Sequence, residues 1–177
     1  SNYGSSSYNT GYSYTTTNPT EIGALLDMLK GKLSNTTQQG TPPTDCVFQS
    51  VAYLAGLYGD SSLNINSMQN MYNSLYSGAI SAGIIKPASG GVDGYLLPSF
   101  SDQYFNRVGG ITTIAQLSNF IAAGGSNFAL ASYGTGNGTG HEFVITGVTS
   151  TQYIGWDAQN QIPVSIDKNL ITGFVAI

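Results

Sequence analysis

The stretch that decides the fold lies at residues 45–59 and reads DCVFQSVAYLAGLYG. Its apolar residues recur at helical spacing, at Val47, Val51, Leu54 and Tyr58. Either Thr44 or Asp45 can cap the start of such a helix, and Gly59 is a typical C-terminal stop. The sequence therefore predicts a largely buried helix that carries Cys46 in its first turn.

The segments on either side of this stretch predict helices first and strands afterwards. Amphipathic patterns predict helices at 22–33, 65–82 and 112–123, with a loop at 35–44 and a Gly/Pro-rich segment at 86–98. After a Gly-Gly pair, short β-rich runs predict strands at 128–133, 142–148, 152–156, 162–166 and 171–177, with a flexible glycine-rich loop at 134–140. This order is typical of an α+β domain with an antiparallel sheet.

Length and composition fit one domain with an N-terminal arm. The chain has 177 residues, enough to bury a substantial core without disulfides or metals. Residues 1–20 are rich in Ser, Thr, Tyr and Gly and show no apolar periodicity. We therefore expect a low-complexity arm or linker at 1–20 and a folded domain at 21–177.

Charge is scarce along the chain. Charged residues make up 8% of it, against about 25% in typical soluble domains, and the net charge is −4. The five basic residues are scattered, whereas nucleic-acid binding requires clustered cations, so we expect no nucleic-acid partner. No apolar run approaches the roughly 20 residues of a membrane-spanning helix. The hydroxyl- and amide-rich composition favours a secreted or cell-envelope protein.

The chain contains one cysteine, Cys46, and one histidine, His141. A single cysteine excludes an intrachain disulfide, and one thiolate with one imidazole is too few for a cysteine-rich structural zinc site. We therefore expect neither a metal nor a cofactor, and any chemistry must be built from this pair of side chains.

The order of three side chains indicates nucleophilic catalysis. A thiol attacks as the thiolate, which the N-terminus of a helix favours at Cys46 and which an imidazolium at His141 would favour further. A catalytic imidazole needs a third group that fixes its orientation. If the strands at 142–148 and 152–156 pair as a hairpin, His141 and Asp157 meet at the same edge of the sheet.

These residues resemble the papain-like cysteine peptidase superfamily. The resemblance rests on the Asp-Cys pair that opens an apolar helix (45–46), on GHEFVITGV (140–148) and on the Trp-Asp strand end (156–157), and it spans residues 38–160. Compact bacterial branches that process bacteriocin leaders are the most similar. The resemblance implies N-terminal helices, with the nucleophile on a central helix that packs against a C-terminal antiparallel sheet.

The resemblance also implies a cofactor-free hydrolysis of peptide bonds in a peptide or protein substrate. Cys46 would be the nucleophile, His141 the general base and then acid, and Asp157 the residue that orients the imidazole. The family stabilises the oxyanion with a glutamine, usually six residues before the nucleophile. Gln39 precedes Cys46 by seven residues and is our choice, although Gln38 is equally conceivable.

The sequence departs from the family pattern in places. Val47 stands where many papain relatives have Gly, and Ala158 follows Asp157 where bacterial branches commonly have Pro. Glu142 follows His141, but successive side chains of a strand point to opposite faces, so we expect no role for it.

Two other functions stay open. The first is a cell-wall peptide amidase or a transglutaminase-like acyl transferase that uses the same three residues. The second is a non-catalytic papain-like module for binding or adhesion.

Overall fold

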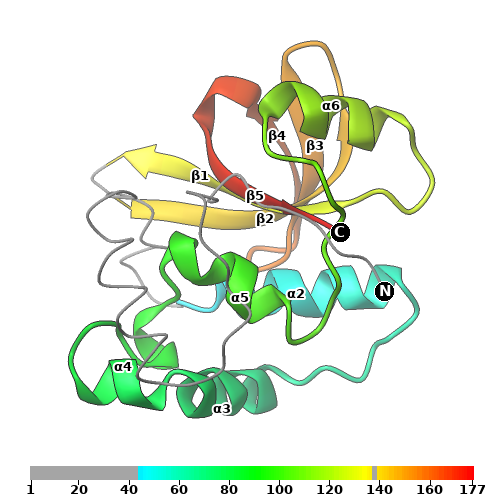
Figure 1. Ribbon diagram of the computed structural model, residues 1–177. Helices are drawn as coiled ribbons and strands as arrows, with labels where there is room; N and C mark the ends of the chain where they lie inside the picture. Colours follow the sequence, from blue (N-terminus) through cyan, green and yellow to red (C-terminus); the bar gives the residue numbers. More distant parts are fainter. Residues whose placement is uncertain (1–43, 137–138) are drawn as a thin grey trace.

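The computed structural model describes residues 44–136 and 139–177. Helices come first along the chain and an antiparallel sheet follows, which confirms the α+β class (Figure 1). The predicted arm at 1–20, the predicted helix at 22–33 and nearly all of the predicted loop at 35–44 lie outside the described residues.

The predicted central helix is α2, Cys46–Leu57. Apolar side chains on one side of it are fully buried, because a spacing of three and four residues places them on one face: Val47, Phe48, Val51 and Leu54. Asp45 occupies the N-cap position, but its side chain does not cap the helix. Gly59, with a φ of +88°, follows the end of the helix in a conformation that favours glycine.

The helix predicted at 65–82 is two helices, α3 (Ile65–Leu75) and α4 (Ser77–Ser81). The chain bends between them at Tyr76, whose buried ring lies 5.0 Å from that of Tyr72. The Gly/Pro-rich segment forms two 3-10 turns and a short helix: η1 (Ala88–Gly90), η2 (Gly94–Leu96) and α5 (Leu97–Ser101).

The last helix, α6 (Ile114–Ala122), falls within the predicted range 112–123. It starts at a capping box, in which the Thr113 hydroxyl accepts the backbone N–H of Gln116 while the Gln116 side chain accepts the backbone N–H of Thr113. This reciprocal pair explains why the helix begins after Thr113.

All five predicted strands are present in one antiparallel sheet of order β4-β3-β2-β1-β5. They are β1 (Ala129–Gly136), β2 (Thr139–Val148), β3 (Gln152–Asp157), β4 (Ile162–Asp167) and β5 (Ile171–Ala176), with the 3-10 turn η3 (Lys168–Leu170) before β5. The loop predicted at 134–140 is wrong in extent, because the β1–β2 ladder continues through a Gly134–Gly140 pair. His141 therefore lies within β2 and not before it.

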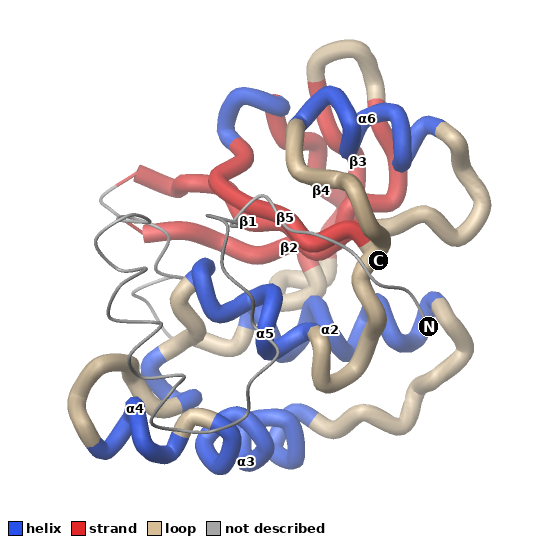
Figure 2. Tube along the Cα trace, in the orientation of Figure 1, coloured by secondary structure: helices blue, strands red, loops and turns tan. Residues whose placement is uncertain are grey.

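Helices cover both faces of the sheet (Figure 2). On one face α2 packs across β2, with α3 beyond it, and on the other face lies α6. Side chains of β2 alternate between the two: Val144 joins the core that includes α2, whereas Phe143 and Ile145 join the core that includes α6. This alternation decides which side chains of β2 meet α2.

Strands β2 and β3 approach closely at Gly155. A Cβ atom placed on Gly155 would lie 1.9 Å from the carbonyl oxygen of Val144, which no side chain tolerates. The close approach therefore requires glycine at this position.

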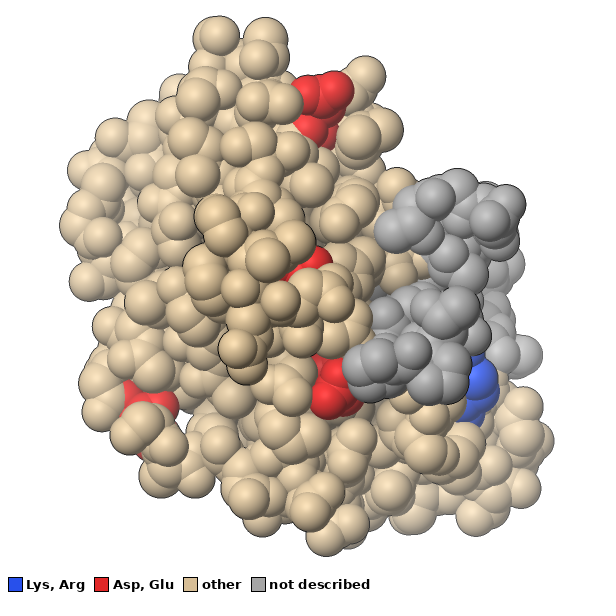
Figure 3. Space-filling model, turned by 180° about the vertical axis from the view of Figure 1, so that it is seen from behind, with Lys and Arg blue, Asp and Glu red and all other residues tan. Residues whose placement is uncertain are grey.

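The surface carries few charges. The face in Figure 3 shows acidic side chains that stand apart from one another and very little basic surface. None of the helices in the described part of the chain is both long and apolar enough to cross a membrane.

Candidate active site

The β2–β3 hairpin brings His141 and Asp157 together. Val144 pairs with Trp156, so the register places Asp157 diagonally across from His141 on the same face of the sheet. His141 Nε2 lies 2.8 Å from Asp157 Oδ2, and both side chains are buried. The sequence predicted this pairing, and the geometry confirms it.

Asn160 also holds Asp157, which the sequence analysis missed. The backbone N–H of Asn160 donates to Oδ1 at 3.0 Å, and its side-chain amide donates to Oδ2 at 2.8 Å. Burial acts to raise the pKa of Asp157, but the bonds from Asn160 and the nearby His141 outweigh it and hold the pKa below its ordinary value. Asp157 is therefore ionised at neutral pH. An Asp followed three residues later by Asn in a turn was the available signal.

The ring of His141 is fixed in orientation. Because Nε2 bonds to Asp157, Nδ1 is the nitrogen that can face a nucleophile. Tyr133 on β1 meets the imidazole edge-on, with ring centroids 5.8 Å apart, and its ring also packs on Phe143.

The sulfur of Cys46 lies beside the strand that carries His141. Cys46 is the first residue of α2, and backbone N–H groups of Glu142 and Val47 hydrogen-bond to its thiolate form. The N–H of Glu142 belongs to the peptide bond that joins it to His141. The three predicted residues therefore come from α2, β2 and β3, and the backbone of β2 next to His141 lies against the sulfur.

The resting thiol is less acidic than the sequence predicted. Cys46 is only 1% exposed, and this burial, with the nearby Glu142 carboxyl as the next cause, raises the pKa of the thiol far above its ordinary value. The two backbone N–H groups lower the pKa but do not compensate. The helix N-terminus alone did not predict the acidity of the resting thiol, because desolvation penalises a buried anion more strongly than the N-terminus stabilises it.

Glu142, to which we assigned no role, faces the nucleophile. Because the Glu142 side chain points away from His141, it lies with Val144 on the face of the sheet that α2 covers. Its side chain is fully buried, no described residue hydrogen-bonds to its carboxyl oxygens, and burial raises its pKa well above the ordinary value. A glutamate within an apolar strand was the signal in the sequence.

Asp45 connects the start of α2 to the turn after β3. Its carboxylate accepts hydrogen bonds from the side-chain amides of Gln49 at 3.1 Å and Gln159 at 3.0 Å. Close by in sequence, Trp156 on β3 stacks on Tyr53 of α2, with centroids 5.8 Å apart and an interplanar angle of 20°. These contacts fix α2 against β3.

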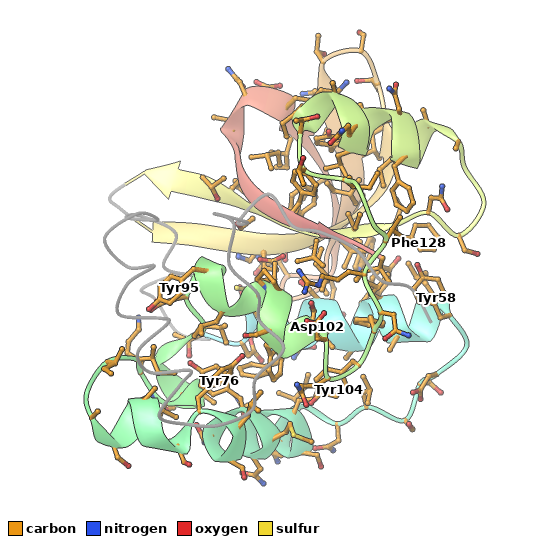
Figure 4. The ribbon with its side chains drawn as sticks, viewed as in Figure 1. Tyr58, Tyr76, Tyr95, Asp102, Tyr104 and Phe128 are labelled. Atoms are coloured by element: carbon orange, nitrogen blue, oxygen red, sulfur yellow. The ribbon has the colours of Figure 1, made fainter. Side chains whose placement is uncertain are left out.

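The remaining predicted donor, Gln39, and its alternative Gln38 lie outside the described residues. A cavity of about 290 Å³ lies at the opposite end of α2 from Cys46 and is lined in part by Phe105, Tyr58 and Tyr104. Figure 4 labels the last two of these residues. This cavity is separate from the site. Within the described residues no cluster of His, Cys, Asp and Glu is suited to hold a metal ion.

Comparisons of the chain with protein-family models, with curated proteins and with solved structures find no match.

Proposed function

We propose that the chain is a papain-like cysteine peptidase in which Cys46 is the nucleophile, His141 the general base and acid, and Asp157 the group that orients the imidazole. The observation that carries the proposal is the 2.8 Å bond between His141 Nε2 and Asp157 Oδ2, with Cys46 at the start of α2 against the backbone of Glu142, the residue after His141. This bond leaves Nδ1 for proton transfer, and an ionised Asp157 stabilises the imidazolium that forms.

In the proposed reaction the Cys46 thiol gives its proton to His141 Nδ1 while the sulfur attacks the carbonyl carbon of a peptide bond. The backbone N–H groups at the start of α2 and, by the family resemblance, Gln39 stabilise the tetrahedral oxyanion. His141 then protonates the leaving amine, and a thioester remains on Cys46. Water, deprotonated by His141, attacks this thioester; the C–S bond breaks, the acid is released, and the proton on His141 returns to the Cys46 sulfur.

The raised thiol pKa favours proton transfer during the attack over an ion pair formed in advance. A neutral thiol avoids a buried anion at rest, whereas the pair of Asp157 and His141 can accept the proton when a carbonyl carbon is in place. The proposal includes a secreted or cell-envelope location, which the composition favours, in bacteria, whose compact branches of the family the chain resembles.

Alkylation of Cys46 tests the proposal. The wild-type chain should react with iodoacetamide and with the epoxide inhibitor E-64 in the folded state, and C46A should not react. H141A should slow the reaction by at least about tenfold, because positioned general bases contribute on the order of a hundredfold or more. Equal rates for wild type and H141A would overturn the catalytic pairing.

Product analysis separates the peptidase from related enzymes. A peptide library analysed by mass spectrometry should yield cleaved peptides with wild type and none with C46A. Cleavage confined to murein peptides indicates the amidase, and products joined to an added amine indicate the acyl transferase.

A non-catalytic papain-like binding module is the second candidate function, and the burial of Cys46 favours it. In that case the thiol reacts only when the domain opens. Its alkylation rate would then follow the unfolding rate and would be insensitive to H141A.

A further inference from the structure

Glu142 is the buried ionisable group near the site that the proposed mechanism does not use. Its relative exposure is 0%, and neither carboxyl oxygen has a hydrogen-bond partner among the described residues. Buried carboxyl groups normally have partners, because an unpaired polar atom in the interior lowers stability. Because the unpaired Glu142 carboxyl lowers the stability of the fold, we expect it to have a functional role.

Its position points to Cys46. Strand alternation puts the Glu142 side chain on the face of the sheet that α2 covers, and the backbone N–H of the same residue hydrogen-bonds to the sulfur. Apart from burial, the Glu142 carboxyl has the largest effect on the pKa of Cys46, larger than that of Asp45, the neighbour in sequence.

The other acidic groups around the pair already have hydrogen-bond partners. From α2, Asp45 accepts bonds from Gln49 and Gln159; from β3, Asp157 accepts bonds from His141 and Asn160. From β1, Ser132 pairs with Glu142 in the ladder and bonds to Thr172, while Tyr133 pairs with His141. Among these acids, Glu142 is thus the one whose carboxyl has no hydrogen-bond partner in the described part of the chain.

We propose that Glu142 is a positioning residue that controls the charge of Cys46: the buried pair holds at most one negative charge, so Cys46 ionises only while Glu142 is protonated. This inference deepens the proposed function and rests on Cys46 being the nucleophile. The protonated carboxyl adds no negative charge beside the sulfur, so the sulfur can carry the transient charge of the attack. The ionised carboxylate opposes it by like-charge repulsion.

The test is the pH profile of Cys46 alkylation by iodoacetamide, measured between about pH 5 and about pH 9 in wild type and in E142Q. Glutamine has the shape of the protonated acid and cannot ionise. We expect the two profiles to coincide at the acidic end, where Glu142 is protonated, and E142Q to be alkylated about tenfold faster than wild type above the pH at which Glu142 ionises, because the wild-type carboxylate then raises the thiol pKa by about one unit. D60N, which removes one charge from exposed Asp60 beyond the far end of α2, should keep the wild-type profile.

The outcomes are separable. An E142Q profile that coincides with wild type, or that lies below it at every pH, overturns the role of Glu142. If H141A also fails to slow alkylation, the proposed function fails as well; if H141A slows it, only the inference fails.

A measurement on wild type keeps the inference testable if E142Q does not fold. Carbon NMR of the Glu142 carboxyl should report a protonated acid wherever Cys46 is alkylated rapidly. An ionised carboxylate at a pH where alkylation is still fast overturns the proposal.

Discussion

The side-chain amide of Gln159 donates a hydrogen bond of 3.0 Å to the carboxylate of Asp45, which precedes the nucleophile in the chain. Gln159 belongs to the turn in which Asn160 holds Asp157. One turn therefore contacts both the helix that carries Cys46 and the carboxylate that orients His141. This arrangement makes the relative position of sulfur and imidazole depend on the loop after β3.

Substitution Q159E tests this connection, because it places a second carboxylate against Asp45. We expect the free energy of unfolding at neutral pH to fall by on the order of 1 kcal/mol, as for like charges in a partly exposed pair. Urea denaturation measures the change. The double variant D45N/Q159E should regain most of the loss, since the amide introduced at position 45 can donate to the carboxylate introduced at position 159. Equal stability of Q159E and wild type would contradict the expectation.

Asn160 should stabilise the fold only while Asp157 is ionised. N160A removes one charge-assisted hydrogen bond and should cost about 2 kcal/mol of unfolding free energy at pH 7. Because the folded pKa of Asp157 is lowered, this stabilisation is complete above the unfolded pKa, near 4, and is lost as the pH falls through the folded pKa. Urea denaturation should therefore show a smaller difference in unfolding free energy between N160A and wild type below about pH 3 than at about pH 7.

The matched control for N160A is N70A, which truncates an exposed asparagine on α3. Its stability should stay within about 0.5 kcal/mol of wild type at both pH values. A loss in N160A that is the same in acid as at neutral pH would show that the side chain acts by packing and not through the charge of Asp157.

Glu142 should make the fold less stable as the pH rises. Its folded pKa is raised by burial, so above about pH 4.5 the unfolded carboxyl ionises while the folded one stays protonated. Stability should decline by up to about 1.4 kcal/mol per pH unit until the folded pKa is reached. Urea denaturation of wild type and E142Q between about pH 5 and about pH 8 measures this. E142Q should lack the decline, and two parallel curves would refute the expectation.

Local patterns in the sequence predicted the elements well. The spacing of apolar residues in 45–59 predicts α2, and the two runs on either side of residues 149–151 predict the β2–β3 hairpin, from which the His141–Asp157 contact follows. Both features depend on residues that are close together in the chain, so their patterns can be recognised in the sequence.

Properties that depend on distant packing were missed. Alternation correctly put Glu142 opposite His141, but only the fold shows that α2 covers that face. The helix macrodipole that favours the Cys46 thiolate can be read from nearby residues in the chain, whereas the burial that outweighs it comes from the whole core. Asp45 lies at the N-cap position, yet its side chain bonds to Gln159, 114 residues away.

Gly155 should be indispensable to the site for a steric reason. G155A puts a Cβ atom 1.9 Å from the Val144 carbonyl oxygen, a backbone atom that cannot rotate aside, so β2 and β3 must separate. We expect a loss of about 3 kcal/mol or more in unfolding free energy, measured in urea. Alkylation of Cys46 in the protein that remains folded should slow toward the rate of H141A, because the same pairing holds His141 beside Asp157.

G147A is the matched control for G155A, since it adds the same methyl group to the same pair of strands. Its Cβ would lie 3.7 Å from the Cβ of Ile154, an ordinary van der Waals contact, so the change in stability should stay below about 1 kcal/mol. If both variants were equally stable, the close approach of β2 and β3 would not be what requires glycine at 155. If G155A alone lost stability but kept the wild-type alkylation rate, the His141–Asp157 contact would not depend on the register at this point of the hairpin.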